Sequence, residues 1–189
     1  LLQVVAELVH EGARVLDLGC GEGELLAYLK AKRQAHGIGM EIDPARITAC
    51  LAKGVNVIEQ DLNLGLGRFS DDAFDVVVMT ETLQALRRPD EALREMLRVG
   101  RECIVSFPNF GYWPHRLSIF RGRMPVSKSL PYEWYNTPNV RVLTIRDFEA
   151  LAPKVGLVIL DRVVLHEGSV VRWGANWRGS VAVYRVRAG

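Results

Sequence analysis

A glycine-rich loop, Gly19-Cys20-Gly21-Glu22-Gly23, follows a short apolar run and precedes a leucine-rich helical pattern. A strand, a glycine loop and a helix in this order form the place where α/β proteins hold a phosphate or an adenosine group. Gly19 permits a tight turn, Gly21 lets a ligand approach the backbone, and Gly23 lets the helix pack close to the strand. The loop therefore predicts a nucleotide-like ligand at the carboxyl end of the first strand.

Acidic residues around this loop indicate which ligand fits. Asp17, two residues before the loop, can accept a hydrogen bond from a cationic amino group, whereas Glu22 inside the loop would repel a pyrophosphate. Glu41 follows Gly21 by about 20 residues, at the end of the second expected strand, where an acid binds both ribose hydroxyls. Asp61, after the third strand, could receive the adenine amine. With G-x-G-x-G spacing rather than G-x-G-x-x-G, these residues favour S-adenosylmethionine over NAD.

Each of these residues also has a structural interpretation. An ordinary strand–helix turn would account for the glycines alone. Asp61 could be a solvated loop acid or a helix cap, and Cys20 could simply be a small residue tolerated between glycines. The glycines occur together with Asp17 and Glu41 at the spacing that a ligand site requires, and this combination favours binding over an ordinary turn.

The elements that must position these residues alternate between strand and helix, which is typical of a parallel sheet covered by helices. No helical pattern separates the last two strands, so we expect them to form an antiparallel pair. Expected helices begin near Glu24, Pro44, Pro89 and Thr144. Expected strands cover residues 14–18, 37–42, 55–59, 74–79, 103–107, 156–165 and 180–187. The sequence predicts one α/β domain, residues 1–189.

Composition excludes several classes of protein. The chain has 189 residues, 49% of them apolar, and a net charge of +2, which is too small to imply nucleic acid as a partner. Three separated cysteines without a C-x-x-C pair indicate neither a disulfide framework nor a metal site. No apolar run approaches the roughly 20 residues of a membrane span. We therefore expect a cytoplasmic protein without metal.

The alternation breaks between Pro108 and about Leu143, a segment rich in proline, glycine, arginine and aromatic residues. A loop this long inside a compact domain is usually functional. Aromatic residues with arginine are typical of protein interfaces, but also of a lid over an apolar substrate or of packing over a sheet edge. Single-stranded nucleic acid binding uses similar mixtures, and the near-neutral charge disfavours it. We call residues 108–143 the insert.

A methyl acceptor oxygen or nitrogen often needs a general base. The candidates are Glu81, His115 and Asp147. Glu81 could be that base, or it could bind cofactor or solvent. His115 lies in the insert, and a lone loop histidine is more often a packing residue. The sequence identifies no convincing base, so catalytic residues stay undefined.

Five segments, VLDLGCGEGELL, GIGMEID, EQDLN, FDVVVMTETLQAL and REMLRVGRECIVSFPN, together resemble class I S-adenosylmethionine-dependent methyltransferases. The resemblance implies a Rossmann-like, seven-stranded, mostly parallel sheet with an antiparallel last strand and helices on both faces. It also implies a binding site for S-adenosylmethionine or S-adenosylhomocysteine. In that site the methionine portion would lie on the glycine loop, the ribose on Glu41 and the adenine on Asp61. The expected cofactor-binding residues are Asp17, Gly19, Cys20, Gly21, Gly23, Glu41, Ile42, Asp61, Leu62 and Thr80.

Further segments, LREMLRVGR, IVSFPNFGYW, GRMPVSKSLPYEWYNTPNVR and TIRDFEAL, resemble the MetW family of methionine biosynthesis proteins. The resemblance runs nearly end to end, and the stretch Pro108–Arg146 is its most specific part. It implies association with homoserine O-acyltransferase, the early enzyme of methionine synthesis, as a partner or activator. Two functions remain open: a cofactor-binding regulator of that enzyme, and a methyltransferase for a small metabolite with the insert as its lid. A fold that has lost cofactor binding is a third possibility.

Overall fold

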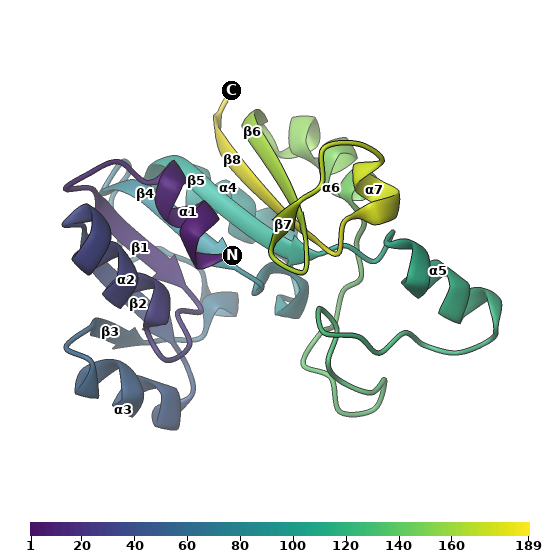
Figure 1. Ribbon diagram of the computed structural model, residues 1–189. Helices are drawn as coiled ribbons and strands as arrows, with labels where there is room; N and C mark the ends of the chain where they lie inside the picture. The colour runs from purple at the N-terminus through teal and green to yellow at the C-terminus, as the bar shows by residue number, and fades with distance from the viewer.

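The computed structural model describes the whole chain, Leu1–Gly189. Its first two-thirds alternate strands and helices as predicted (Figure 1). These elements are α1 (Leu2–Leu8), β1 (Arg14–Leu18), α2 (Glu24–Arg33), β2 (His36–Glu41), α3 (Pro44–Ala52), β3 (Asn56–Glu59), β4 (Phe74–Thr80), α4 (Pro89–Val99) and β5 (Gly100–Pro108). The remainder forms α5 (Trp113–Phe120), α6 (Ile145–Leu151), β6 (Leu157–His166), β7 (Ser169–Val170), α7 (Ala175–Arg178) and β8 (Val181–Ala188).

All strands join one sheet in the order β3-β2-β1-β4-β5-β8-β6-β7. β1 to β5 pair in parallel, and β8 runs antiparallel to both of its long neighbours, β5 and β6. This confirms the predicted mostly parallel sheet with an antiparallel last strand. The strand order reverses between β1 and β4, and ligands of open α/β sheets bind at such a switch point, beyond the carboxyl ends of the strands.

The sheet has eight strands where seven were predicted, because β6 continues into a short hairpin. Glu167 and Gly168, with φ of 48° and 83°, form the turn, and Leu165 then pairs with Val170. Two consecutive residues with positive φ are what a tight type I′ hairpin turn requires. The added strand has only two residues and changes nothing at the switch point.

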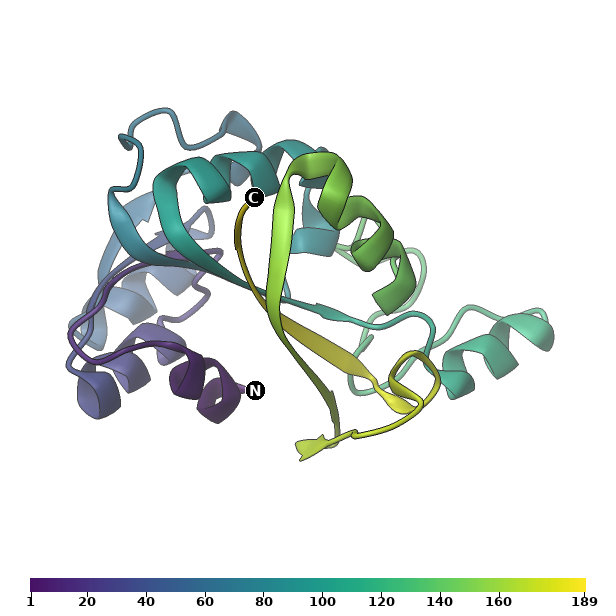
Figure 2. The same cartoon turned by 90° about the horizontal axis from the view of Figure 1, so that it is seen from above.

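Helices cover both faces of the sheet, as predicted. On one face α1, α2 and α3 enclose a cluster that includes Val5, Leu29 and Cys50. On the other face α4 and α6 enclose a larger cluster that includes Met96 and Phe148. Figure 2 shows the purple helices α1 and α2 on one side of the strands and the teal and green helices α4 and α6 on the other. No helix is long and apolar enough to cross a membrane.

Apart from Leu143 at its end, which packs against the larger cluster, the insert lies outside both clusters. No residue from 110 to 142 belongs to either one. Its one helix, α5, was not predicted, because two turns with a proline at the second residue carry too short a period to recognise. α5 projects away from the sheet in Figure 1. The end of the insert returns to the domain, where Val140 and Arg141 donate their backbone N–H groups to the Gln84 carbonyl, both at 3.0 Å.

Asn109, directly after β5, ties the start of the insert to the C-terminal elements. Its side chain is fully buried and makes four hydrogen bonds. Nδ2 donates to the carbonyls of Asn176 and Gly179 at 3.2 and 2.8 Å, and Oδ1 accepts from the N–H groups of Gly111 and Ile145 at 3.0 and 3.2 Å. One side chain therefore joins β5, α6 and α7.

We expect Asn109→Ala to lower the free energy of unfolding by about 3 kcal/mol, because four buried backbone groups lose their partner at once. Urea unfolding followed by circular dichroism measures this. Asn136→Ala is the matched control, since Asn136 is exposed and its side chain makes no hydrogen bond within the chain. A loss below about 1 kcal/mol for Asn109→Ala would show that water replaces the amide and that it is not a structural junction.

Candidate functional site

The glycine loop has the geometry that its sequence predicts. Gly19, Gly21 and Gly23 all have positive φ, between 56° and 75°. A Cβ at Gly23 would lie 3.0 Å from the Cys50 sulfur of α3 and 3.2 Å from Val55, so Gly23 permits close packing against α3 and the residue before β3, whereas nothing lies within 4 Å of a Cβ at Gly21. A Cβ at Gly19 would meet Thr82, after β4, at 2.6 Å. The loop thus closes over the switch point while Gly21 leaves open space for a ligand.

Glu41, at the end of β2, organises the loop around its carboxylate. Although buried, it accepts backbone N–H groups from Gly21 at 3.0 Å, from Ile42 at 2.8 Å and from Asp43 at 3.0 Å. A guanidinium nitrogen of Arg46, on the first turn of α3, lies 3.9 Å from the Glu41 carboxylate. Charge-assisted hydrogen bonds of this kind fix the carboxylate firmly. Glu41 therefore holds the glycine loop and presents a fixed negative charge to the adjoining cavity.

Asp17 lies beneath the loop on β1 and is 1% exposed. Its Oδ1 atom is buried and has no hydrogen-bond partner. Burial, together with the nearby charge of Glu41, raises the pKa of Asp17 to about 7. A buried carboxyl oxygen without a partner is costly, and a cationic or hydrogen-donating ligand group would satisfy it.

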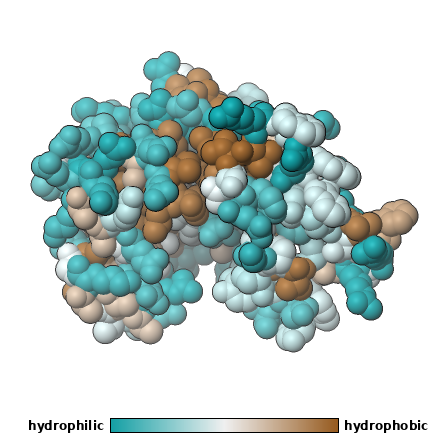
Figure 3. All heavy atoms as spheres, viewed as in Figure 1, coloured by the Kyte–Doolittle hydropathy of each residue, from teal (hydrophilic) through white to brown (hydrophobic).

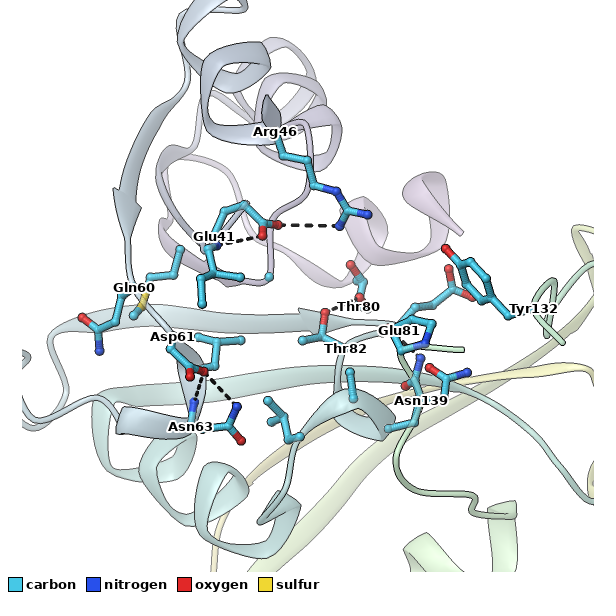
Figure 4. A pocket seen from close by; sticks show the side chains of 18 of the residues that line it. Glu41, Arg46, Gln60, Asp61, Asn63, Thr80, Glu81, Thr82, Tyr132 and Asn139 are labelled. Atoms are coloured by element: carbon cyan, nitrogen blue, oxygen red, sulfur yellow. Dashed lines mark hydrogen bonds and ion pairs between the residues drawn. The ribbon is translucent and has the colours of Figure 1, made fainter. Parts of the chain in front are cut away.

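A cavity of about 530 Å³ opens beside Glu41, at the carboxyl ends of β1, β2 and β4. Figure 4 shows Glu41 and Arg46 on one side of it, Gln60 and Asp61 at one end, and Glu81 at the other. Figure 3 shows the surface hollowed below the sheet, between the two lower lobes of the molecule. Of the predicted residues, those that line the cavity are Gly19, Glu41, Ile42, Asp61, Leu62 and Thr80.

The other predicted residues, Asp17, Cys20, Gly21 and Gly23, do not line the cavity but lie in or under the loop that borders it. Cys20 is buried, with its sulfur 3.8 Å from that of Cys50. Burial raises the pKa of the Cys20 thiol, which disfavours a thiolate there. Its contacts fit the interpretation as a small packing residue.

Asp61 has the helix-capping role that the sequence left open, and it also lines the cavity. It caps the short 3₁₀ helix Leu62–Leu64, with Oδ1 accepting from the backbone and side-chain nitrogens of Asn63 at 2.9 and 2.8 Å. These hydrogen bonds hold the pKa of Asp61 below its usual range, so the carboxyl stays ionised. Because it also lines the cavity, a fixed acceptor faces the place expected for adenine.

The three base candidates lie in different surroundings. Glu81, with φ of 51°, follows β4 and lines the cavity, and burial raises its pKa. His115 is buried outside the cavity, with Nδ1 3.2 Å from the Asn109 carbonyl and Nε2 2.9 Å from Ser127 Oγ. Asp147 completes the capping box of α6 with Thr144. Of the three, only Glu81 is in a position to reach a ligand in the cavity.

Several cavity residues carry no signal in the sequence. Tyr132 and Asn139 come from the insert, whose lack of period hides where its side chains point. Arg46 and Gln60 also line the cavity. Among these residues only Asn63 has a recognisable sequence signal. Asp61, two residues earlier, favours a local turn that brings the side chains of Asp61 and Asn63 together. The insert therefore forms one wall of the candidate site.

The sheet order and the match to solved structures define the class of fold: this is a Rossmann-like methyltransferase fold. An S-adenosylmethionine-dependent methyltransferase of Thermotoga maritima, described as a possible histamine N-methyltransferase, matches with a TM-score of 0.71. It covers 98% of this chain and 86% of its own, at 22% identity. The [4+2]-cyclase SpnF matches with a TM-score of 0.72 over 99% and 80% of the two chains, at 19% identity. The fold alone thus leaves the reaction open.

The chain belongs to the MetW family, because the family model of methionine biosynthesis protein MetW matches residues 2–186. A relative in Rhodopirellula baltica, named bifunctional methionine biosynthesis protein MetXA/MetW, is 40% identical over 169 residues. That match covers 84% of this chain and 27% of the relative, so the chain spans about a quarter of the relative's length.

Proposed function

We propose that this protein binds S-adenosylmethionine or S-adenosylhomocysteine in the cavity beside Glu41 and acts as a partner of homoserine O-acyltransferase in methionine biosynthesis. The observation that carries the cofactor proposal is the buried Oδ1 of Asp17, which has no partner within the chain. A ligand amino group near the glycine loop would supply that partner. Glu41 would accept from the ribose hydroxyls and Asp61 from the adenine amine.

The cavity fits the charge of this cofactor. Glu41, Asp61 and Glu81 line it, against the cationic side chains of Arg46 and Lys128. S-adenosylmethionine carries a sulfonium and an ammonium group, so an acidic lining stabilises it more than it would a pyrophosphate. The methyl group on that sulfonium is the chemistry that the cofactor supplies when bound.

The partner proposal is supported by the exposed apolar surface of the insert. Phe120 is 88% exposed, Trp134 72% and Tyr135 71%. In Figure 3, apolar side chains gather where the outer end of α5 lies. Trp134 and Tyr135 lie against each other with their ring centres 5.8 Å apart, and adjoining exposed aromatic residues of this kind mark interaction sites. In the Rhodopirellula baltica relative, MetXA and MetW are named together in one chain, which favours the acyltransferase as the partner here.

The experiment that tests this proposal is homoserine acylation by the acyltransferase, with and without this protein, over a range of S-adenosylmethionine concentrations. A change in rate that depends on this protein supports the partnership, and its dependence on the cofactor would show coupling between the two sites. No change in rate, together with no complex on a sizing column, would contradict the partnership.

Cofactor binding is tested independently by isothermal titration with S-adenosylmethionine and S-adenosylhomocysteine. Absence of heat with both, confirmed by an unchanged melting temperature, would show that the fold has lost its cofactor.

A second function, methyl transfer to a small metabolite, is favoured by a second hollow of about 420 Å³. Glu81, Lys128 and Ser129 line both this hollow and the cofactor cavity, so an acceptor there would adjoin the methyl group. Glu81 would hold the acceptor or receive its proton. Transfer of labelled methyl to a metabolite pool, abolished by Asp17→Ala, would support this function. Transfer to no metabolite would leave the partner role alone.

A further inference from the structure

A surface of arginine and tryptophan side chains lies outside both the cofactor cavity and its second hollow. It surrounds α7 and consists of Arg116, Arg146, Arg162, Trp173, Trp177 and Arg178, which we call the α7 surface. Its centre is a hollow of about 390 Å³ lined by the first three arginines and Trp177. Trp173 is 71% exposed and Trp177 53%. Exposed aromatic side chains that gather on one surface mark interaction sites.

The charge of the α7 surface is unbalanced. Glu149 is the acidic residue in the hollow, and it already accepts from Arg162 at 2.6 Å and from the Tyr184 hydroxyl at 2.9 Å. Arg116 and Arg146 form no ion pair within the chain. Two positive charges in the hollow are therefore free to pair with a partner's carboxylates.

Two of the arginines, Arg116 and Arg178, are held in place before any partner binds. Arg116 donates Nε–H to the Gly111 carbonyl at 2.6 Å, and its guanidinium lies 5.3 Å from the ring centre of Trp177. Arg178 lies over Trp173 at 4.1 Å. An arginine stacked on an aromatic ring keeps N–H groups at its edge for carboxylates and loses less side-chain entropy on binding.

The support beneath the surface is also rigid. The α7 backbone is held by Asn109, and a Cβ at Gly179, directly after α7, would come within 2.0 Å of a Val164 methyl group. α7 therefore packs against β6 with no room for a side chain between them. A four-residue helix fixed in this way serves as a platform for its exposed side chains.

We propose that the α7 surface is a docking site for an acidic segment of the acyltransferase partner, with a carboxylate of that segment in the hollow between Arg116 and Arg146. This inference rests on the proposed partnership and adds the chemistry and place of contact. Arginine and tryptophan dominate the energy of protein interfaces, and stacked guanidinium groups bind carboxylates in a fixed geometry. A nucleic acid is disfavoured because the whole chain carries a net charge of only +2.

The test measures the affinity of the full chain for the acyltransferase by surface plasmon resonance at low and moderate salt. The Arg146→Glu/Arg178→Glu double variant is expected to bind at least about 30-fold more weakly at low salt, with a flatter salt dependence. Trp177→Ala is expected to weaken binding about tenfold. Arg68→Glu is the control, because Arg68 is exposed, unpaired and outside this surface. All variants should keep wild-type melting temperatures and cofactor affinity.

The outcomes separate this inference from the proposal on which it rests. If the wild-type protein forms no complex with the acyltransferase, both fail. If it forms a complex that the double variant and Arg68→Glu bind equally well, the partnership stands and the α7 surface is not its docking site. Binding of a labelled single-stranded RNA that the double variant loses, with unchanged affinity for the acyltransferase, would assign the surface to nucleic acid and overturn the inference.

Discussion

Glu41→Ala should lower the affinity for S-adenosylmethionine by at least about 100-fold, because it removes two kinds of interaction at once. The carboxylate would bind the ribose hydroxyls, and it also fixes the loop through the Gly21 N–H at 3.0 Å. Losing charge-assisted hydrogen bonds to a ligand costs about 3 kcal/mol for two of them, and loosening of the loop adds to this. Isothermal titration measures the change directly.

Glu59→Ala is the control for this prediction. Glu59 ends the neighbouring strand β3, is exposed and forms no ion pair, so its removal takes away the same charge at a similar place in the fold. We expect it to change affinity less than about threefold. If Glu41→Ala were equally mild while remaining folded, the ribose would not lie against Glu41 and the orientation of the proposed cofactor would be wrong.

Much of the fold was predictable because its sequence signals are local. An apolar run between glycines gave β1, a fully apolar run gave β4 nearly to the residue, and Thr144 gave the start of α6. The capping box of α6 shows how far such rules extend. Asp147 takes the place usually held by glutamate, and both hydrogen bonds of the box form: the Thr144 N–H donates to Asp147 Oδ2 at 3.0 Å, and the Asp147 N–H donates to Thr144 Oγ1 at 3.3 Å.

The parts that could not be predicted depend on contacts between distant residues. Tyr132 reaches the cavity only because Val140 and Arg141 fasten the insert to Gln84, a contact across about 56 residues that no local period encodes. The role of Asn109 likewise depends on Gly179, 70 positions away. Local sequence signals therefore located the glycine loop and the acidic residues beside the cavity, and left the wall that the insert forms undefined.

The insert links the two halves of the proposed function. Lys128, Ser129, Tyr132 and Asn139 face the cofactor cavity, whereas Trp134 and Tyr135, within the same stretch, face outward. A ligand in the cavity would contact one side of this stretch, and a partner would contact the other. Each site would then influence the other through differential contacts with one segment, which is the requirement for coupled binding.

Asp17 should make cofactor affinity depend on pH, rising as the pH increases towards about 7. Burial raises the pKa of Asp17 to about 7 in the ligand-free protein, and an ammonium group of the ligand would bind its ionised form. Below that pKa, binding must release a proton, so affinity falls by up to tenfold for each pH unit. Titrations at pH 5.5, 6.5 and 7.5 measure this, and Asp17→Asn should weaken binding at pH 7.5 and remove the dependence.

The same ionisation of Asp17 predicts that the stability of the ligand-free protein falls as the pH rises, whereas the cofactor affinity rises. Between pH 4 and 7 the folded chain holds a proton on Asp17 that the unfolded chain releases, so the free energy of unfolding falls as pH rises, by up to about 4 kcal/mol for a shift of about three pKa units. Asp17→Asn should remove this contribution.

Methylthioadenosine is the ligand control for the predicted pH dependence of cofactor affinity. It lacks the amino acid portion, so its affinity should not change between pH 5.5 and 7.5. If its affinity followed pH as that of S-adenosylmethionine does, Asp17 would act on the loop and not on the ligand's amino group.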